Sequence, residues 1–301
     1  MVREDALTRF AWLSIAAALT TFTLKAVAYL VTGSVGLLSD AFESTVNLVA
    51  AIVALLALRL AARPPDHNHQ FGHGKVEYLS AGVEGGMIFA VALAIAVTAV
   101  PRLLEPRELE ALGLGLAVSA VASAINLAVG LVLVRAGRRH HSLTLSADGQ
   151  HLLADVWTTA GVFVGVIAAQ ATGWERLDPV VALLVAVNIM VTGVRLMRRS
   201  TAGLMDEALP EGEHAAIDGV LDGYRAQGVE FHALRTGEAG SWRIVTVHVL
   251  VPGAWSVQRG HDLVEQIEAD LGRAVPGAAV FTHLEPVEDP VSWEDVELGP
   301  R

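Results

Sequence analysis

The sequence predicts a membrane protein in which a bundle of six spanning helices precedes a small α+β domain. Of the 301 residues, 53% are hydrophobic and 18% are charged, and the mean hydropathy is +0.49. Soluble globular proteins carry about 25% charged residues, so this chain lacks the polar surface that water would require. The absence of cysteine excludes disulfides, catalytic thiols and thiolate metal ligands.

A change in charge marks the boundary between the two parts of the chain. Residues 1–200 carry 15 Lys+Arg and 14 Asp+Glu, whereas residues 201–301 carry 6 and 18. We therefore expect a membrane domain over residues 1–205, a second domain over residues 206–290 and a C-terminal tail over residues 291–301. The acidity of the second part would attract cations and argues against nucleic acid as a partner.

Six apolar stretches make up the membrane part, each long enough for the roughly 20 helical residues that a bilayer core requires. They cover residues 10–32, 34–61, 79–101, 112–134, 144–174 and 179–198. Basic residues gather at every second connection, and because such residues prefer the cytoplasmic side, we expect both termini in the cytoplasm. These basic residues are Arg3, Arg9, Arg59, Arg63, Lys75, Arg135, Arg138, Arg139, Arg195, Arg198 and Arg199.

The acidic part shows alternating helix and strand patterns. Helical periodicity is present over residues 210–225 and 256–275, and strand-like runs cover residues 229–236, 242–251 and 278–285. The resulting order, αββαβ, suits a small open sheet with helices on one face.

Two of the apolar stretches share a pattern of polar residues at positions i, i+3 and i+7, which lie on one helical face. The pattern occurs as Asp40, Glu43 and Asn47 in the second stretch and as Asp148, His151 and Asp155 in the fifth. Ionisable groups at bilayer depth cost several kcal/mol, so they generally face the bundle interior and serve transport.

The repeated pattern predicts a tetrahedral cation site formed by Glu43, Asn47, His151 and Asp155. Carboxylates, an amide and an imidazole suit Zn²⁺, Fe²⁺, Mn²⁺ or Co²⁺, and the lack of thiolate argues against Cu⁺. The alternative is that these groups only form hydrogen bonds between helices. For Asp40 and Asp148 two interpretations stay open, a role in transport or capping of a helix start.

Two further clusters contain metal-ligating residue types. The connection after the second stretch carries Asp66, His69 and His73 close to glycines, which predicts a solvent-accessible metal site or, alternatively, an ordinary polar loop. In the second domain, His283 and Glu285 are two residues apart on one strand and so share a face. Together with His232, His248 and His261 they favour a metal site over purely structural histidines.

Several segments in order resemble the cation diffusion facilitator family of divalent metal/proton antiporters. They are GSVGLLSDAFESTVN, FGHGKVEYLSA, SADGQHLLADVWTTAGV and HALRTGEAGSWRIVTVHV. The resemblance implies six membrane helices and a cytoplasmic αββαβ domain with a ferredoxin-like, metallochaperone-like fold. It also implies a transport site at the four residues of the second and fifth stretches, a loop site at Asp66, His69 and His73, and a binuclear site at His232, His248, His261, His283 and Glu285 that helps hold a homodimer.

One departure from the family pattern affects the choice of ion. Many zinc exporters of the family carry His or Asp followed four residues later by Asp, whereas this chain has Glu43 and Asn47. One anionic ligand is thus replaced by an amide, which leaves iron, manganese and cobalt open beside zinc.

The sequence therefore predicts a multi-pass secondary transporter that exports Zn, Fe, Mn or Co from the cytoplasm in exchange for protons. We expect it in a bacterial inner membrane as a homodimer, with no prosthetic group. The alternative is a metal-gated channel or a metal sensor without coupled proton transport. An enzyme is not expected, because the chain shows neither an HExxH pair nor a nucleophile elbow.

Overall fold

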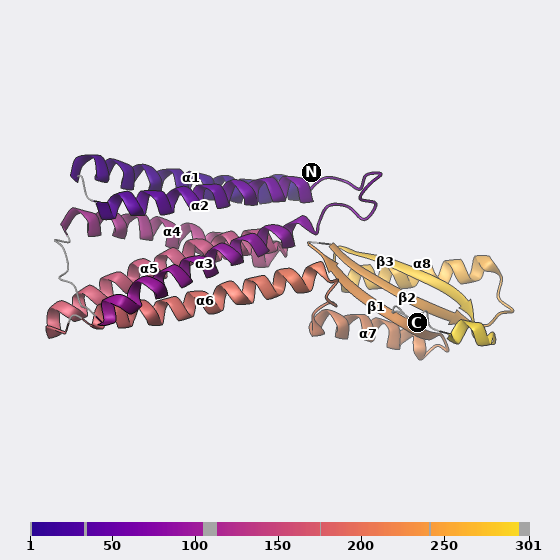
Figure 1. Cartoon of the computed structure of the whole chain (residues 1–301). Coiled ribbons are helices and arrows are strands. Elements are labelled where there is room, and N and C mark those ends of the chain that lie inside the picture. The colour runs from indigo at the N-terminus through magenta and orange to yellow at the C-terminus, as the bar shows by residue number, and fades with distance from the viewer. Residues whose placement is uncertain (1, 33–34, 105–112, 175, 241, 295–301) are drawn as a thin grey trace. The chain divides into compact units, whose positions relative to one another are not determined.

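The computed structural model describes residues 2–32, 35–104, 113–174, 176–240 and 242–294 (Figure 1). The chain divides into two compact units, Met1–Leu204 and Met205–Arg301. Each unit has its own hydrophobic interior and is considered by itself.

In its described residues the first unit consists of six long helices. They are α1 (Val2–Thr32), α2 (Val35–Ala61), α3 (Val76–Leu104), α4 (Gly113–His140), α5 (Leu143–Thr172) and α6 (Leu177–Leu204). Five contain segments that are long and apolar enough to cross a membrane: Leu7–Val31, Ser44–Ala61, Val76–Leu104, Ala117–His140 and Pro179–Leu204. The remaining helix, α5, packs against both α4 and α6. The prediction of a helical membrane bundle followed by a small sheet domain is confirmed.

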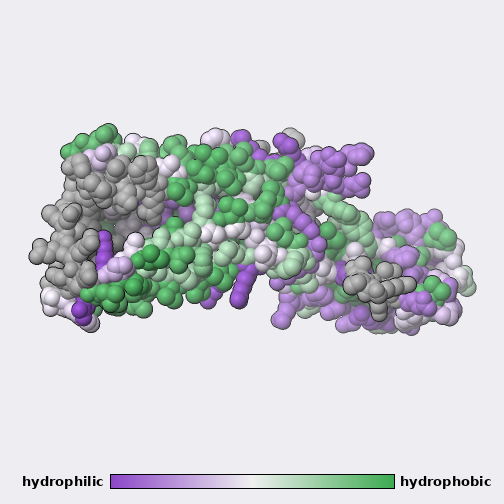
Figure 2. Space-filling model, in the orientation of Figure 1, coloured by the Kyte–Doolittle hydropathy of each residue, from purple (hydrophilic) through white to green (hydrophobic). Residues whose placement is uncertain are grey.

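The surface of the bundle matches a lipid environment. Figure 2 shows hydrophobic residues over much of the bundle, whereas hydrophilic residues are frequent on the second unit. Large apolar side chains on the bundle are strongly exposed, among them Leu30 at 79% and Leu184 at 67%. Such surface is stable only in contact with lipid or another protein, so the chain is an integral membrane protein.

Glycines allow α4 and α5 to approach closely. A Cβ atom on Gly149 would lie 2.8 Å from the backbone nitrogen of Val134 and 2.9 Å from the carbonyl oxygen of Gly130. Small residues at helix interfaces are the usual means of close packing in membranes. This contact fixes the position of the first half of α5, on which His151 and Asp155 lie.

The second unit contains a three-stranded sheet and two longer helices. Its elements are α7 (Glu211–Arg225), β1 (Glu230–Ala239), β2 (Trp242–Val251), α8 (Val257–Ala274), β3 (Ala278–Pro286) and the 3₁₀ helix η1 (Pro290–Trp293). The strand order is β1-β2-β3, with β1 antiparallel and β3 parallel to β2. The parallel pair requires a crossover connection, which α8 provides. The observed order is the predicted αββαβ.

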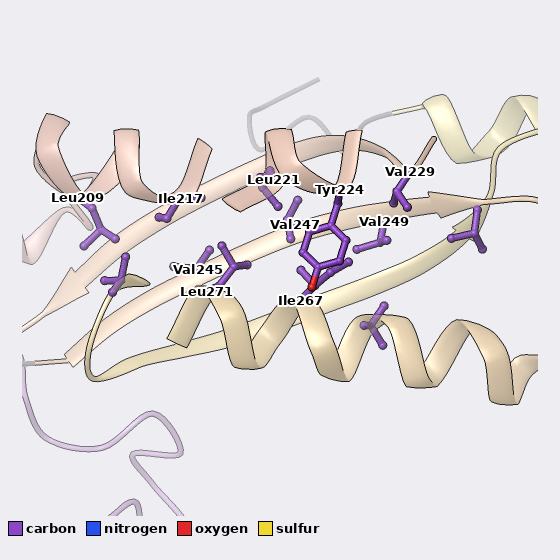
Figure 3. Packing of buried hydrophobic residues seen from close by; sticks show 13 residues of the cluster. Leu209, Ile217, Leu221, Tyr224, Val229, Val245, Val247, Val249, Ile267 and Leu271 are labelled. Atoms are coloured by element: carbon purple, nitrogen blue, oxygen red, sulfur yellow. The ribbon is translucent and has the colours of Figure 1, made fainter. Parts of the chain in front are cut away.

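The core of this unit lies between one face of the sheet and the two helices (Figure 3). Val245, Val247 and Val249 of β2 are fully buried against residues of α7 and α8 such as Leu221 and Ile267. Because side chains alternate along a strand, His248 lies on the opposite face of the sheet. The core therefore determines which face carries the histidines.

Candidate functional site

A cluster of polar side chains lies inside the membrane unit between α2 and α5. The Asn47 amide connects the other two members, because its Oδ1 lies 2.9 Å from His151 Nε2 and its Nδ2 donates a hydrogen bond to Asp155 Oδ2. Asn47 is 5% exposed and His151 is 3% exposed. The four-residue spacing of His151 and Asp155 places both on the face of α5 that meets α2. Three of the four predicted transport ligands thus lie together.

The fourth predicted ligand, Glu43, lies one helical turn before Asn47 in α2. Its side chain falls outside the described residues, as does that of Asp40. The backbone of Asp40 lies five residues inside α2, and Asp148 lies five residues inside α5 with 1% exposure. The interpretation that these two aspartates cap helix starts is therefore wrong, because an N-cap residue precedes the first helical turn.

Two polar residues of the membrane interior were not predicted from the sequence. Asn126 of α4 is 5% exposed, and its Nδ2 lies 3.4 Å from Asp155 Oδ2, so α4 also contributes to the cluster. Glu84 of α3 is fully buried, and neither of its carboxylate oxygens has a hydrogen-bond partner among the described residues. Their positions within apolar stretches could have identified both residues, because buried polar groups in membranes are rarely incidental.

The loop between α2 and α3 brings together Asp66, His69 and His73. Asp66 Oδ1 lies 3.3 Å from His69 Nδ1, and Asp66 Oδ2 lies 3.2 Å from His73 Nε2. The backbone amides of Asn68 and His69 also donate to Asp66 Oδ1 at 2.9 and 2.7 Å. The hydrogen bond from the His69 backbone lowers the pKa of Asp66 below its ordinary value of 3.8. The carboxylate is thus ionised and ready to act as a ligand.

On the sheet, strand register brings three histidines side by side. His232 of β1 pairs with His248 of β2, and His248 pairs in turn with His283 of β3. Glu285 Oε2 lies 3.0 Å from both His232 Nε2 and His248 Nδ1, and Glu285 Oε1 lies 3.6 Å from His283 Nδ1. The carboxylate of Glu285 is therefore the centre of the cluster.

His261 is not brought to this cluster within one chain. It lies near the start of α8 with a side chain 56% exposed, and its Nδ1 is 3.9 Å from Glu265 Oε1. An aromatic ring that the sequence analysis did not single out does approach the cluster, because Trp293 of η1 has its centroid 5.9 Å from that of His232.

The loop and sheet clusters both fit a cation. In each, three residues offer ligand atoms that all lie within 4.8 Å of one another, namely Asp66, His69 and His73, and His232, His248 and Glu285. Tetrahedral zinc sites have metal–ligand bonds of about 2.0–2.2 Å, which separates neighbouring ligand atoms by roughly 3.4 Å. Small adjustments of side chains would therefore bring either set to coordinating distance.

A membrane bundle with buried ligand-type residues, joined to a sheet domain with a second ligand cluster, is typical of a metal-ion transporter. Residues 11–205 match the family model of the cation efflux transmembrane domain, and residues 209–287 match that of the cation efflux protein cytoplasmic domain. The chain belongs to the cation efflux family, which is the cation diffusion facilitator family that the motifs resemble. A metal cation is accordingly its transported substrate.

Relatives extend over nearly the full length of the chain. An uncharacterized transporter of Synechocystis is 53% identical over 97% of this chain and 94% of its own length. The cation-efflux pump FieF of Pectobacterium atrosepticum is 34% identical over 90% of both chains. The pump of the same name from Shewanella oneidensis is 32% identical over 91% of this chain and 92% of its own.

Proposed function

We propose that the protein is a secondary antiporter that moves a divalent transition-metal ion out of the cytoplasm in exchange for protons. The observation that carries the proposal is the buried contact of Asn47 with both His151 and Asp155. With Glu43 they supply four nitrogen or oxygen ligands for one dehydrated Zn²⁺, Fe²⁺, Mn²⁺ or Co²⁺ ion. An imidazole and carboxylates suit these ions, although they do not distinguish among them.

Exchange with protons follows from the chemistry of the ligands. A metal ligand must be deprotonated, so cation binding displaces protons from His151 and from the carboxylates. Proton uptake from the opposite side of the membrane favours release of the ion. The Asn47 amide contacts both the imidazole of His151 and the carboxylate of Asp155. Rearrangement of helix groups around this site would provide alternating access.

The proposal assigns separate roles to the other two clusters. Residues 206–290 form a cytoplasmic regulatory domain in which His232, His248, His283 and Glu285 bind metal, and residues 291–301 form its tail. His261 lies away from these groups in one chain. In a homodimer it would contribute a ligand to the second metal ion of this binuclear site. Asp66, His69 and His73 form an accessory site at the cytoplasmic side of a bacterial inner membrane.

Transport into proteoliposomes tests the proposal. Vesicles with an acidic interior are exposed to Zn²⁺, Fe²⁺, Mn²⁺ or Co²⁺, and metal accumulation and internal pH are recorded together. We expect accumulation of at least one ion above its external concentration, a matching rise in internal pH, and loss of both when a protonophore removes the gradient. Asp155→Asn should abolish accumulation, because it removes the charge that neutralises the ion.

The alternatives give different results. A channel would equalise the metal concentration without dependence on the pH gradient, and a sensor would transport nothing. Retention of full coupled transport by a folded Asp155→Asn protein would refute the assignment of the transport site.

A further inference from the structure

A groove of about 470 Å³ lies between α4, α5 and α6, on a side of α5 other than the one that carries the buried cluster. Three exposed arginines line it: Arg138, Arg195 and Arg199. Its apolar walls include Leu153 and Ile189, and Trp157 also lines it.

The arginines all belong to one end of the bundle. Arg138 lies two residues before the end of α4, and Arg195 and Arg199 lie nine and five residues before the end of α6. Trp157 lies 14 residues beyond the start of α5, which begins at the same end. At 1.5 Å per residue, it lies about 20 Å along the helix. The groove is thus basic at one end of the bundle, and further along the helices its lining is mixed, with Leu153, Trp157 and Ile189 beside Asn188 and Thr192.

Within the described part of the chain, the positive charge of the groove has no acidic partner. Of the described residues that line the groove, none is acidic. Among the described residues, none of the ion pairs involves Arg138, Arg195 or Arg199. Three guanidinium groups close to one apolar groove therefore call for an anion that also carries an apolar part.

We propose that this groove binds an anionic phospholipid of the surrounding bilayer. The guanidinium groups would contact the headgroup phosphate, for which their planar fork of donors is well suited. An acyl chain would follow the wall that Leu153, Trp157 and Ile189 form. Basic pockets between membrane helices are known to accept such headgroups. The apolar continuation of the groove favours a lipid over a free phosphate ion, which would leave that wall unused.

Native mass spectrometry of the purified full-length protein with added lipid tests the proposal. The probes are dioleoyl phosphatidylglycerol, dioleoyl phosphatidylcholine and inorganic phosphate. The test variant is Arg138→Gln/Arg195→Gln/Arg199→Gln. The matched control is Arg135→Gln/Arg139→Gln/Arg198→Gln, which removes the same number of charges from the same two helices but from exposed residues that do not line the groove.

We expect phosphatidylglycerol to bind the native chain more tightly than phosphatidylcholine. The test variant should weaken phosphatidylglycerol binding by about 100-fold, because each basic residue near an anionic lipid contributes about fivefold. The control variant should bind as the native chain does. The single variant Arg195→Gln should show about a fivefold loss, which keeps the test informative if the triple variant does not fold.

Three outcomes would overturn the proposal. Equal weakening in the test and control variants would mean that the arginines act only as general positive charge. Equal binding of the two lipids would mean that the groove does not select anionic headgroups. Binding of inorganic phosphate as tight as that of phosphatidylglycerol would make the groove a site for free anions.

Discussion

The buried cluster of the bundle and the histidine cluster of the sheet use the same kinds of ligand in opposite surroundings. Asn47 and His151 are 5% and 3% exposed. On the sheet, the side chains of His248 and His283 are 24% and 66% exposed. Water can reach the ligands on the sheet, whereas an ion must lose its hydration shell to reach those in the bundle.

The two clusters also differ in what positions their ligands. His232, His248 and His283 are neighbours through backbone pairing of three strands, which holds their positions by main-chain hydrogen bonds. Asn47 and Asp155 come from different helices and are held by a side-chain hydrogen bond. Movement of α2 relative to α5 would therefore change the buried cluster. This difference suits the exchange of ions that we propose for the bundle and the binding of ions that we propose for the sheet.

The largest effect should come from His151→Asn. This change removes an imidazole that contacts Asn47 in the interior, so metal transport into proteoliposomes should fall to the background of protein-free vesicles. The matched control is His141→Asn, ten residues earlier. His141 is exposed and has a φ of 51°, a conformation that Asn tolerates well. Equal loss of transport in both variants would contradict a specific role for the buried cluster.

The double variant His232→Ala/His248→Ala should lose metal binding on the sheet while it retains transport. Removing two of the imidazoles around Glu285 should weaken metal binding by the second unit by roughly 10⁴-fold or more, since each ligand of a structural metal site contributes several kcal/mol. Transport should persist at a reduced rate. Metal content after gel filtration, measured beside transport, checks both statements. His261→Ala should lower the metal content less, and a larger loss than in the double variant would contradict the cluster described for one chain.

A third effect concerns the stability of the sheet unit alone. Val264→Ala and Val257→Ala are the same substitution on α8, but Val264 is 9% exposed and Val257 is 85% exposed. Val264→Ala should lower the free energy of unfolding of this unit by about 1.5–3 kcal/mol, because buried methyl groups and their packing are lost. Val257→Ala should change it by less than about 0.5 kcal/mol. Hydrogen exchange of β2 amides in the full chain measures both.

Much of the fold could be predicted because periodicity and charge are local properties of the sequence. The strand patterns placed β2 at its observed bounds, Trp242–Val251, and its buried valines left His248 on the other face. β1 ends at Ala239, three residues beyond the prediction, because Ala239 still pairs with Trp242 in the hairpin.

The contacts within the sites depend on tertiary packing, and these could be predicted only in part. Register is shifted between His232 and Arg235, so the sequence did not reveal that His232 lies beside His248. Asn126 escaped attention because α4 carries no charge at that point, although its amide approaches Asp155. Asp148 was open to interpretation as a helix cap because the sequence does not show at which residue α5 begins.

The smallest effect should separate the loop cluster from the other two. Asp66→Asn is introduced into a full-length protein that already carries His151→Asn and His232→Ala/His248→Ala, and Zn²⁺ binding is followed by calorimetry between pH 5.5 and 7.5. The affinity should fall about tenfold.

Since the pKa of Asp66 is lowered below 3.8 by the backbone amide of His69, its carboxylate is charged throughout this range. A depressed carboxyl pKa stabilises the ionised loop above that value, and the benefit is lost only as the pH falls through the lowered pKa. The ratio of the Zn²⁺ affinity of the protein that retains Asp66 to that of the Asp66→Asn variant should therefore be the same at every pH tested. A ratio that grows as the pH rises would mean that Asp66 takes up a proton within this range, and that the loop competes with protons through its acid as well as through its histidines.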